Sequence, residues 1–276
     1  MPRTDPAALV ERDGVSALTW EQFASYPLDA VVTTRHGGVS SGVYESLNLG
    51  LHVDDDTDAV VENRRRAARA IGLNLDDLVF CNQSHGRSVA VVDAGQRGRG
   101  TTTLDDAVDD VDALVTTTPG VGLVVMVADC VPIVLYDPVA HVLACVHAGW
   151  RGTVSLASEA AVSTMVGLGS RPGDIRAAIG PAIEAARYQV GDEVAEAARD
   201  AFGPAAGSVV RPDGTGRWLF DLWAANRYTL QECGLRSERI VTAATGTAAD
   251  EFFSDRAARP CGRFAALAAL RPFPRS

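Results

Sequence analysis

The sequence contains no lysine, and all 25 of its basic residues are arginine. This absence excludes enzymes that form a lysine Schiff base, and it excludes P-loop enzymes, whose lysine contacts nucleotide phosphates. Any phosphate or carboxylate ligand must instead be held by arginine, by backbone amides or by a metal ion.

Other protein classes are excluded by further absences. The five cysteines are widely separated and include no Cys-x-x-Cys pair, which favours the reduced thiols of a cytoplasmic protein over a disulfide framework. The N-terminus lacks the apolar segment of a signal peptide, and no apolar run is long enough to span a bilayer. The formal net charge of -10 and the pI of about 4.9 disfavour nucleic acid and anionic membranes as partners.

Helix and strand patterns are mixed along the 276 residues without strict alternation. Apolar spacing and capping residues predict helices within 54–73, 153–169, 191–202 and 221–234, the first capped by Thr57 or Asp58 and the last by Asp221. Short apolar runs predict strands between them, several of which are joined by tight turns. These patterns indicate an α+β fold with mixed, largely antiparallel sheets, in a single domain (1–276) that opens with an irregular lead-in at 1–29.

The segment ADCVPIVLYDPVAHVLACVHAGWRG, at 128–152, predicts a hairpin that carries a thiol at its start and an imidazole at its end. These are Cys130 and His147, and a third polar side chain, His85, lies in the loop Gln-Ser-His-Gly after an earlier strand. Two imidazoles and one thiolate are a typical ligand set for catalytic zinc, which keeps a fourth position open. The alternative is that Cys130 is a small core residue and both histidines are loop hydrogen-bonders. Cys145 remains a rival ligand, although its apolar setting is typical of a core.

Candidate anion contacts lie in glycine-rich turns. Arg151 follows His147 just before a predicted helix, and Arg35 lies in Thr-Thr-Arg-His-Gly-Gly. Asn48, in Ser-Leu-Asn-Leu-Gly, is either a contact for a polar ligand or the cap of its own turn, and the second is commoner. His36 and His52, in the same loop system, are expected in a pocket wall and not as metal ligands, and His141, in a hairpin turn, is expected to be exposed.

Several segments together resemble the YfiH-type laccase-domain family, whose members have been called polyphenol oxidases and, more recently, purine nucleoside phosphorylases. From Ala30 onward the chain carries them in the family's order: TTRHGGVSSGVYESLNLG, NQSHG, DALVTTTPG, ADCVPIVLYDP, HAGWRG, IGPAIEAARYQVG and FFSDRAARPCGRFAAL. The resemblance implies a layered α/β sandwich and a zinc ion held by His85, Cys130 and His147. It also implies phosphorolysis of adenosine, inosine, guanosine and methylthioadenosine, with deamination of adenosine.

The chain departs from the family pattern at two places. Gly246-Thr247 stands where the family has Cys-Thr, and Ser254-Asp255-Arg256-Ala257 stands where it has Ser, Tyr or Phe, then Arg-Arg. If the second segment lines the pocket, the substrate preference differs from that of the family.

The resulting hypothesis uses Cys130, His147 and Asp129 as the catalytic set. Bound zinc brings the pKa of a water toward ~7. Asp129, the carboxylate nearest in sequence, is the candidate to move its proton, while Arg35, Asn48 and Arg151 bind nucleoside and phosphate.

Three alternatives compete with this hypothesis. A copper-binding, laccase-like polyphenol oxidase is one, because the same ligands bind copper in vitro, although five histidines are too few for a multicopper cluster. A second is a cysteine hydrolase of cell-wall precursors, with Cys130 as nucleophile and His147 or His85 as base. A third is a structural zinc site, which normally has four protein ligands.

Overall fold

The computed structural model describes residues 7–247 and 250–273, and its largest feature is a pair of six-stranded sheets. The first sheet has the order β1 (Ala7–Arg12), β2 (Val15–Trp20), β3 (Leu28–Thr33), β15 (Phe264–Leu270), β7 (Gly122–Val127) and β4 (Leu78–Phe80). The second has the order β14 (Ile240–Thr242), β10 (Arg176–Ile179), β8 (Val131–Asp137), β9 (Val142–Ala148), β6 (Ala113–Thr116) and β5 (Val89–Val91). Most neighbouring strands are antiparallel, so the predicted α+β class with mixed sheets is confirmed.

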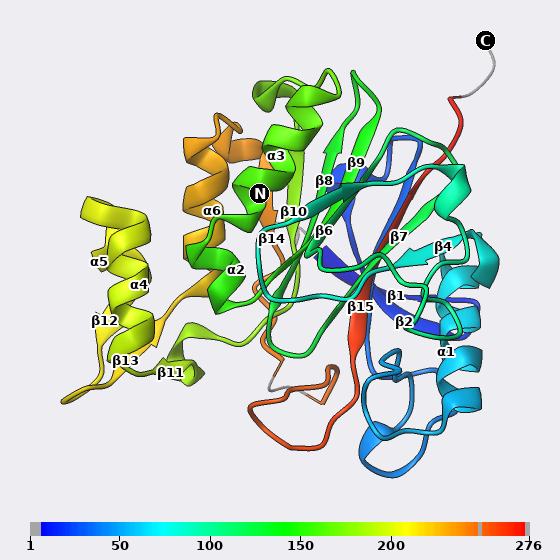
Figure 1. The fold of residues 1–276 in the computed structure, drawn as a ribbon, viewed down its shortest axis with the longest axis horizontal. Helices are drawn as coiled ribbons and strands as arrows, with labels where there is room; N and C mark the ends of the chain where they lie inside the picture. Colours follow the sequence, from blue (N-terminus) through cyan, green and yellow to red (C-terminus); the bar gives the residue numbers. More distant parts are fainter. Residues whose placement is uncertain (1–6, 248–249, 274–276) are drawn as a thin grey trace, which may run out of the picture.

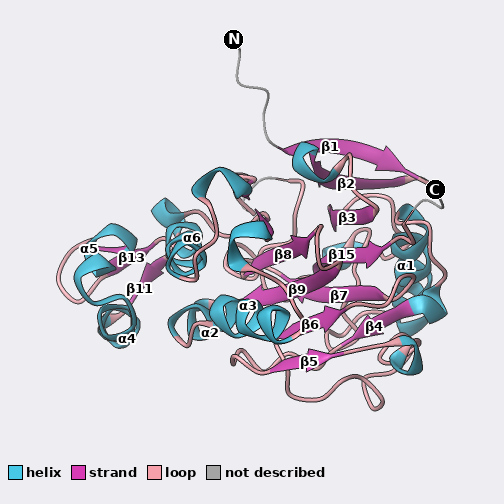
Figure 2. Cartoon of the chain, turned by 90° about the horizontal axis from the view of Figure 1, so that it is seen from above, coloured by secondary structure: helices cyan, strands magenta, loops and turns pink. Residues whose placement is uncertain are grey.

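Helices cover the outer faces of the two sheets (Figures 1 and 2). Helix α1 (Thr57–Ala70) covers the first sheet, and α2 (Trp150–Val154), α3 (Ala157–Gly167) and α6 (Leu222–Glu232) pack on the second. A three-stranded sheet of β11 (Gln189–Val190), β13 (Trp218–Phe220) and β12 (Val210–Pro212) packs with α4 (Asp192–Phe202) and α5 (Ala206–Val209) to one side (Figure 1). In the described residues, no helix has the length and apolar character needed to cross a membrane.

The central strands are apolar throughout because both of their faces are buried. On β7, Leu123 and Val125 face the core between the two sheets, whereas Val124 and Met126 face α1. The same two-residue period on β9 sends Cys145 into the core between the sheets. Both faces of the central strands are therefore packed against other elements. The ends of these strands form a rim of the sandwich.

The lead-in at 1–29 differs from the prediction. Instead of irregular chain, residues 7–20 form the β1–β2 hairpin. Its turn is Asp13-Gly14, with φ of 49° and 77°. Two positive φ angles in succession are typical of the tight hairpin turn that Asp-Gly favours.

The helix predicted at 153–169 is also interrupted. The structure has two helices there, because Leu156 takes a left-handed conformation (φ 63°) between α2 and α3. Helix α1 begins earlier than expected and is capped by Asp56, which accepts from the backbone N–H of Ala59. Helix α6 is capped by Asp221, as predicted.

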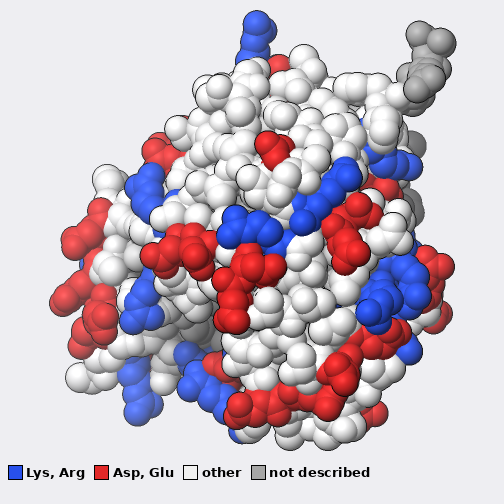
Figure 3. All heavy atoms as spheres, turned by 45° about the vertical axis from the view of Figure 1, so that its right-hand side comes forward, with Lys and Arg blue, Asp and Glu red and all other residues white. Residues whose placement is uncertain are grey.

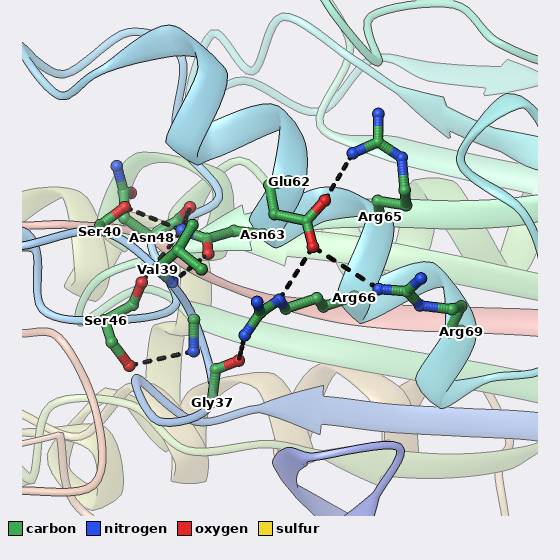
Figure 4. Close-up of polar contacts among 11 residues, drawn as sticks. Gly37, Val39, Ser40, Ser46, Asn48, Glu62, Asn63, Arg65, Arg66 and Arg69 are labelled. Carbon is green, nitrogen blue, oxygen red and sulfur yellow. Dashed lines mark hydrogen bonds and ion pairs between the residues drawn. The ribbon is translucent and has the colours of Figure 1, made fainter.

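The loop before α1 is fixed to that helix by one buried amide. Asn63 donates to Ser40 Oγ and to the carbonyls of Ser46 and Asn48, and its Oδ1 accepts from the N–H of Val39 (Figure 4). A buried amide with all these partners gives the loop a defined shape. Farther along the same loop, His52 lies at the rim of the sandwich.

On the outer face of α1, Glu62 pairs with three arginines, Arg65, Arg66 and Arg69 (Figure 4). The hydrogen bonds from Arg66 and Arg65 lower the pKa of Glu62. Across the face seen in Figure 3, arginines and acidic side chains are interspersed in the same way.

Candidate metal centre and active-site pocket

Three side chains from separate parts of the sequence meet at one rim of the sandwich. His85, Cys130 and His147 each place one donor atom so that all three atoms lie within 4.8 Å of one another. The rings of His85 and His147 are edge to face, with centroids 4.8 Å apart. Nitrogen and sulfur donors at this spacing fit a single zinc or copper ion.

The β8–β9 hairpin explains why a thiol and an imidazole meet. Its register pairs Pro132 with His147 and Val131 with Ala148, so Cys130 lies beside the end of β9. The turn is at the opposite end, where Asp137 accepts from the N–H groups of Val139 and Ala140. The open end of the hairpin therefore holds both donors, and Cys145 lies farther along the strand, fully buried between the sheets.

The residue that orients this cluster is Asp112, which the sequence analysis missed. Its buried carboxylate accepts from His147 Nδ1 at 2.7 Å, from the backbone N–H of His85 at 3.0 Å and from that of Gly86 at 2.6 Å. Ser84 Oγ is the fourth donor. Because a carboxylate only accepts, Nδ1 carries the proton, and Nε2 of His147 is left for a metal.

Only the sheet order reveals this role. Asp112 immediately precedes β6, whose Ala113 pairs with Val146 of β9. The sequence signal was an acidic residue at the start of an expected strand, but nothing in the sequence showed that this strand lies next to His147.

Cys130 and His147 shift each other's pKa, and the resulting thiolate favours binding of a metal cation. Burial alone raises the pKa of the Cys130 thiol, but the charge and hydrogen bonding of His147 and His85 outweigh it and lower that pKa to about 6. Burial lowers the pKa of His147, yet Cys130 and Asp112 outweigh this and raise it to about 9. Without a metal, the pair is therefore thiolate and imidazolium at neutral pH, and the sulfur is already in the form that binds metal.

A cavity of about 490 Å³ opens onto this cluster. Its lining residues are His52, Cys81, Asn82, Gln83, His85, Leu104, Met126, Val127, Ala128, Cys130, His147, Asp255 and Arg263. The volume is within the range of small-molecule sites. His52 lies in this wall as expected, whereas His36 does not: its ring is exposed and lies beside Glu251. Burial together with the charges of Arg263, Arg64 and His85 lowers the pKa of His52 to about 4, so its ring is neutral at pH 7.

Four residues proposed from the sequence do not line this cavity. Asp129 points away from it: its carboxylate accepts from Thr247 Oγ1 and from the N–H of Arg256, and so fixes the C-terminal loop instead of facing a substrate. Asn48 is buried, and its amide bonds to Gly50, Asp55 and the N–H of Arg263. It therefore fixes the loop, the commoner of its two expected roles.

The two proposed arginines also lie elsewhere. Arg35 donates to the carbonyl of Glu45 and stacks on Phe253, 4.6 Å from the ring centroid. Arg151 is exposed and lies over its neighbour Trp150. His141 is not exposed as expected but buried, and its ring is hydrogen-bonded to Tyr136 and to a backbone carbonyl near the C-terminus.

The backbone of Gly149 packs against the cluster, and this position provides a test. A Cβ at this position would lie 2.9 Å from Cys130 Sγ and 3.1 Å from His85 Cδ2. We therefore expect Gly149→Ala to displace two donors and weaken zinc binding by about 10–100-fold, the effect of disturbing a ligand's support. Competition titration with a zinc chelator measures this.

The matched control is Gly167→Ala at the end of α3, where a Cβ would meet no atom within 4 Å. Its zinc affinity should equal that of the wild type, and its stability should be the same or higher by about 0.5–1 kcal/mol. Equal zinc affinity in the two variants would show that Gly149 is not needed for the approach of the donors.

The chain is similar in sequence to a known protein family and to several curated proteins. Residues 29–271 match the family described as multi-copper polyphenol oxidoreductase laccase. The purine nucleoside phosphorylase YlmD of Geobacillus stearothermophilus is 39% identical over 82% of this chain and 84% of its own length. An adenosine deaminase named RL5, from an unknown prokaryote, is 41% identical over 78% and 82%.

Solved structures of YlmD and YfiH proteins have the same fold as this chain. The crystal structure of YlmD from Geobacillus stearothermophilus superposes with a TM-score of 0.92 and 36% identity, covering 98% of this chain and all of that one. A Bacillus licheniformis protein called YfiH gives the same TM-score at 32% identity, over 97% of this chain and all of its own. With these relatives and a family match over most of its length, this protein belongs to the laccase-like family of YfiH and YlmD.

Proposed function

We propose that the protein is a zinc-dependent purine nucleoside phosphorylase that acts on adenosine, inosine, guanosine and methylthioadenosine, and that it also deaminates adenosine. The observation that carries the proposal is the His85–Cys130–His147 cluster at the wall of a cavity large enough for a nucleoside. The names of the relatives, phosphorylase in one case and deaminase in another, support both activities.

The donor set fits a catalytic metal. Three protein ligands leave a coordination position open, and an ionised thiol suits zinc, as does an imidazole that Asp112 orients with Nε2 toward the metal. A bound zinc ion supplies Lewis-acid chemistry at this wall of the cavity.

The two reactions share a nucleoside but break different bonds. In phosphorolysis, a phosphate oxygen bonds to C1′ of the ribose while the bond from C1′ to the purine N9 breaks. The electron pair leaves on the base, which takes up a proton, and the products are purine and ribose 1-phosphate. In deamination, water oxygen replaces the amino group at C6, and ammonia leaves. Only the first reaction requires phosphate.

The test is turnover of nucleosides by protein purified without added metal, after its metal content is measured. With phosphate, we expect adenosine to give adenine and ribose 1-phosphate, together with inosine from deamination and the hypoxanthine released from that inosine; without phosphate, we expect inosine alone. Chelation should stop both reactions and zinc should restore them. A protein that leaves all four nucleosides unchanged while zinc-loaded would contradict the proposal, and oxidation of a phenol after loading with copper would favour the laccase-like alternative.

A second candidate, a cysteine hydrolase, is favoured by one observation. The pKa of Cys130 is lowered beside an imidazolium, as in enzymes with a cysteine nucleophile. This function needs a metal-free thiolate. It predicts an amide hydrolase, for example of cell-wall precursors, whose activity survives chelation and is lost on alkylation.

The same pair predicts how zinc binding depends on pH. Between pH 7 and about 9, Cys130 is a thiolate while His147 keeps the proton that zinc must displace. Zinc affinity should therefore rise about tenfold per pH unit in this window and level off above it, with one proton released per ion. Titrations at several pH values in weakly buffered solution measure both quantities, and an affinity independent of pH would contradict the pair's assigned charges.

A further inference from the structure

We propose that Arg263 binds the phosphate co-substrate in the cavity and that Asp255 sets the strength of that binding. The inference rests on the proposed phosphorylase function, and it identifies the group that receives phosphate. Neither residue was a candidate in the sequence analysis, which placed phosphate on Arg35 and Arg151.

Arg263 is held in place on one side of its guanidinium only. Its Nη1 donates to the carbonyls of Cys261 and Gly262, each at 3.0 Å, and its backbone N–H donates to Asn48 Oδ1 at 2.8 Å. Within the described part of the chain, Nε and Nη2 have no hydrogen-bond partner, and Nη2 lies 3.7 Å from Asp255 Oδ1. A fixed guanidinium whose Nε and Nη2 make no hydrogen bond to the described residues, and only a long ion pair with Asp255, is suited to a phosphate that binds through two oxygens.

The loop before α1 makes room for this arginine. A Cβ on Gly50 would lie 2.8 Å from Cγ of Arg263 and 3.3 Å from Cε1 of His52. Both side chains therefore pack against the bare backbone of Gly50, and both line the cavity. The Asn63 network that shapes the loop thus also positions the wall that contains Arg263.

The other polar groups of the cavity leave few alternatives. Gln83 uses both amide atoms on the backbone of Met126, and Asn82 donates to Leu104 O and to Asp109. The two histidines of the cluster would hold the metal. Since the chain has no lysine, Arg263 is the one permanent cation among the described residues that line this cavity.

A second positive charge lies beneath the wall. Arg64 is completely buried, and it donates to the carbonyls of Leu49 and Thr101 and to the sulfur of Met126, a cavity residue. Another donor hydrogen of Arg64 goes to the carbonyl of Gly100, and among the described residues Arg64 forms no ion pair with a carboxylate. Its field adds to that of Arg263 and favours an anion in the cavity.

Asp255 opposes this attraction. It lines the same cavity, beside Arg263. Its Oδ2 accepts from Arg259 Nε at 2.8 Å, while its Oδ1 lies on the side of Arg263. A carboxylate that lines the cavity beside the phosphate-binding edge repels phosphate and competes for Arg263, which makes the phosphate affinity lower than a neutral residue would allow.

The experiment compares Arg263→Gln and Asp255→Asn with wild type in phosphorolysis of inosine at varied phosphate, using zinc-loaded protein. Arg263→Gln should raise the KM for phosphate on the order of tenfold or more, because charge-assisted hydrogen bonds are lost. Asp255→Asn should lower it by about two- to fivefold. The matched control is Arg199→Gln, which removes an exposed arginine of α4 and should leave the KM unchanged.

Deamination provides the internal comparison, since it uses no phosphate. Arg263→Gln should reduce phosphorolysis of adenosine much more than its deamination, and an equal loss in both would overturn the proposal in favour of a structural role. An unchanged KM for phosphate in Arg263→Gln would also overturn it while leaving the phosphorylase function intact. If Arg263→Gln does not fold, Asp255→Asn decides: a KM that does not fall contradicts the proposal.

Direct binding separates the failure of this inference from failure of the proposed function. Calorimetric titration of zinc-loaded protein with inorganic phosphate should show binding that is weakened in Arg263→Gln and strengthened in Asp255→Asn. This result without nucleoside turnover would keep the phosphate site and reject the phosphorylase. Turnover with wild-type phosphate binding in Arg263→Gln would do the opposite.

Discussion

Cys130→Ala should fold, bind little or no zinc and turn over no nucleoside. The thiolate is one of three donors within 4.8 Å of one another, so its loss leaves only two imidazoles. Zinc affinity should fall by more than the roughly 10–100-fold that follows loss of a ligand's outer partner. Metal analysis after dialysis and an assay of adenosine with phosphate measure the two effects.

The control for thiol removal is Cys145→Ala. Cys145 is fully buried between the sheets, two residues before His147, and burial raises the pKa of its thiol far above the usual range. Its replacement should cost about 1 kcal/mol of stability through lost packing and leave zinc content unchanged. Zinc retained by Cys130→Ala and lost from Cys145→Ala would mean that the wrong cysteine is assigned.

Loss of turnover in Cys130→Ala is expected for a metal ligand and also for a nucleophile, so wild type must separate them. As a ligand, Cys130 should be protected from iodoacetamide by zinc and become reactive after chelation, since its lowered pKa leaves a thiolate. Removal and return of zinc should switch activity off and on. Activity that persists without metal and disappears on alkylation would support the hydrolase alternative.

The sequence was sufficient to predict the elements that depend on local patterns. The β8–β9 hairpin followed from two apolar runs joined at Asp137-Pro138, and α6 followed from its cap at Asp221. The β1–β2 hairpin was missed although Asp13-Gly14 is its turn signal; β2 is mostly buried, but β1 is exposed or half-buried along its whole length and has no buried apolar face. The break at Leu156 has no local signal, since leucine rarely adopts a left-handed conformation.

The residues of the site also fall into two groups: those that local sequence patterns predict and those that only the fold brings together. Residues at strand ends, such as Cys130 and His147, could be proposed because one hairpin brings them together. Asp112 and Arg263 could not, because each reaches the site through a neighbouring strand or loop that is remote in sequence. The anion contacts were assigned to arginines in glycine-rich turns, and the structure places those side chains on Phe253 and Trp150. Sequence pattern identified the types of residue, while the sheet order determined which of them meet.

The second large effect is expected from Asp112→Asn, which keeps the shape of the side chain but replaces one acceptor with a donor. Its two oxygens accept from His147, His85, Gly86 and Ser84. An NH₂ group at either position faces a donor that then has no acceptor in the buried site, which should cost about 1–3 kcal/mol of stability. His147 also loses its fixed orientation, so zinc affinity should fall by about 10–100-fold.

If Asp112 only supported the fold, Asp112→Asn would lower stability without changing zinc affinity. Both quantities must therefore be measured in this variant and in one control variant. Asp137→Asn changes another buried aspartate, whose Oδ1 accepts from Val139 and Ala140 and whose Oδ2 has no hydrogen-bond partner in the described residues. An amide nitrogen can replace that Oδ2 without losing a bond, so both stability and zinc affinity should be nearly unchanged. Chelator competition and thermal unfolding of the metal-free proteins measure the two quantities. Wild-type zinc affinity in Asp112→Asn would show that this carboxylate supports only the fold, and that the cluster keeps its geometry without it.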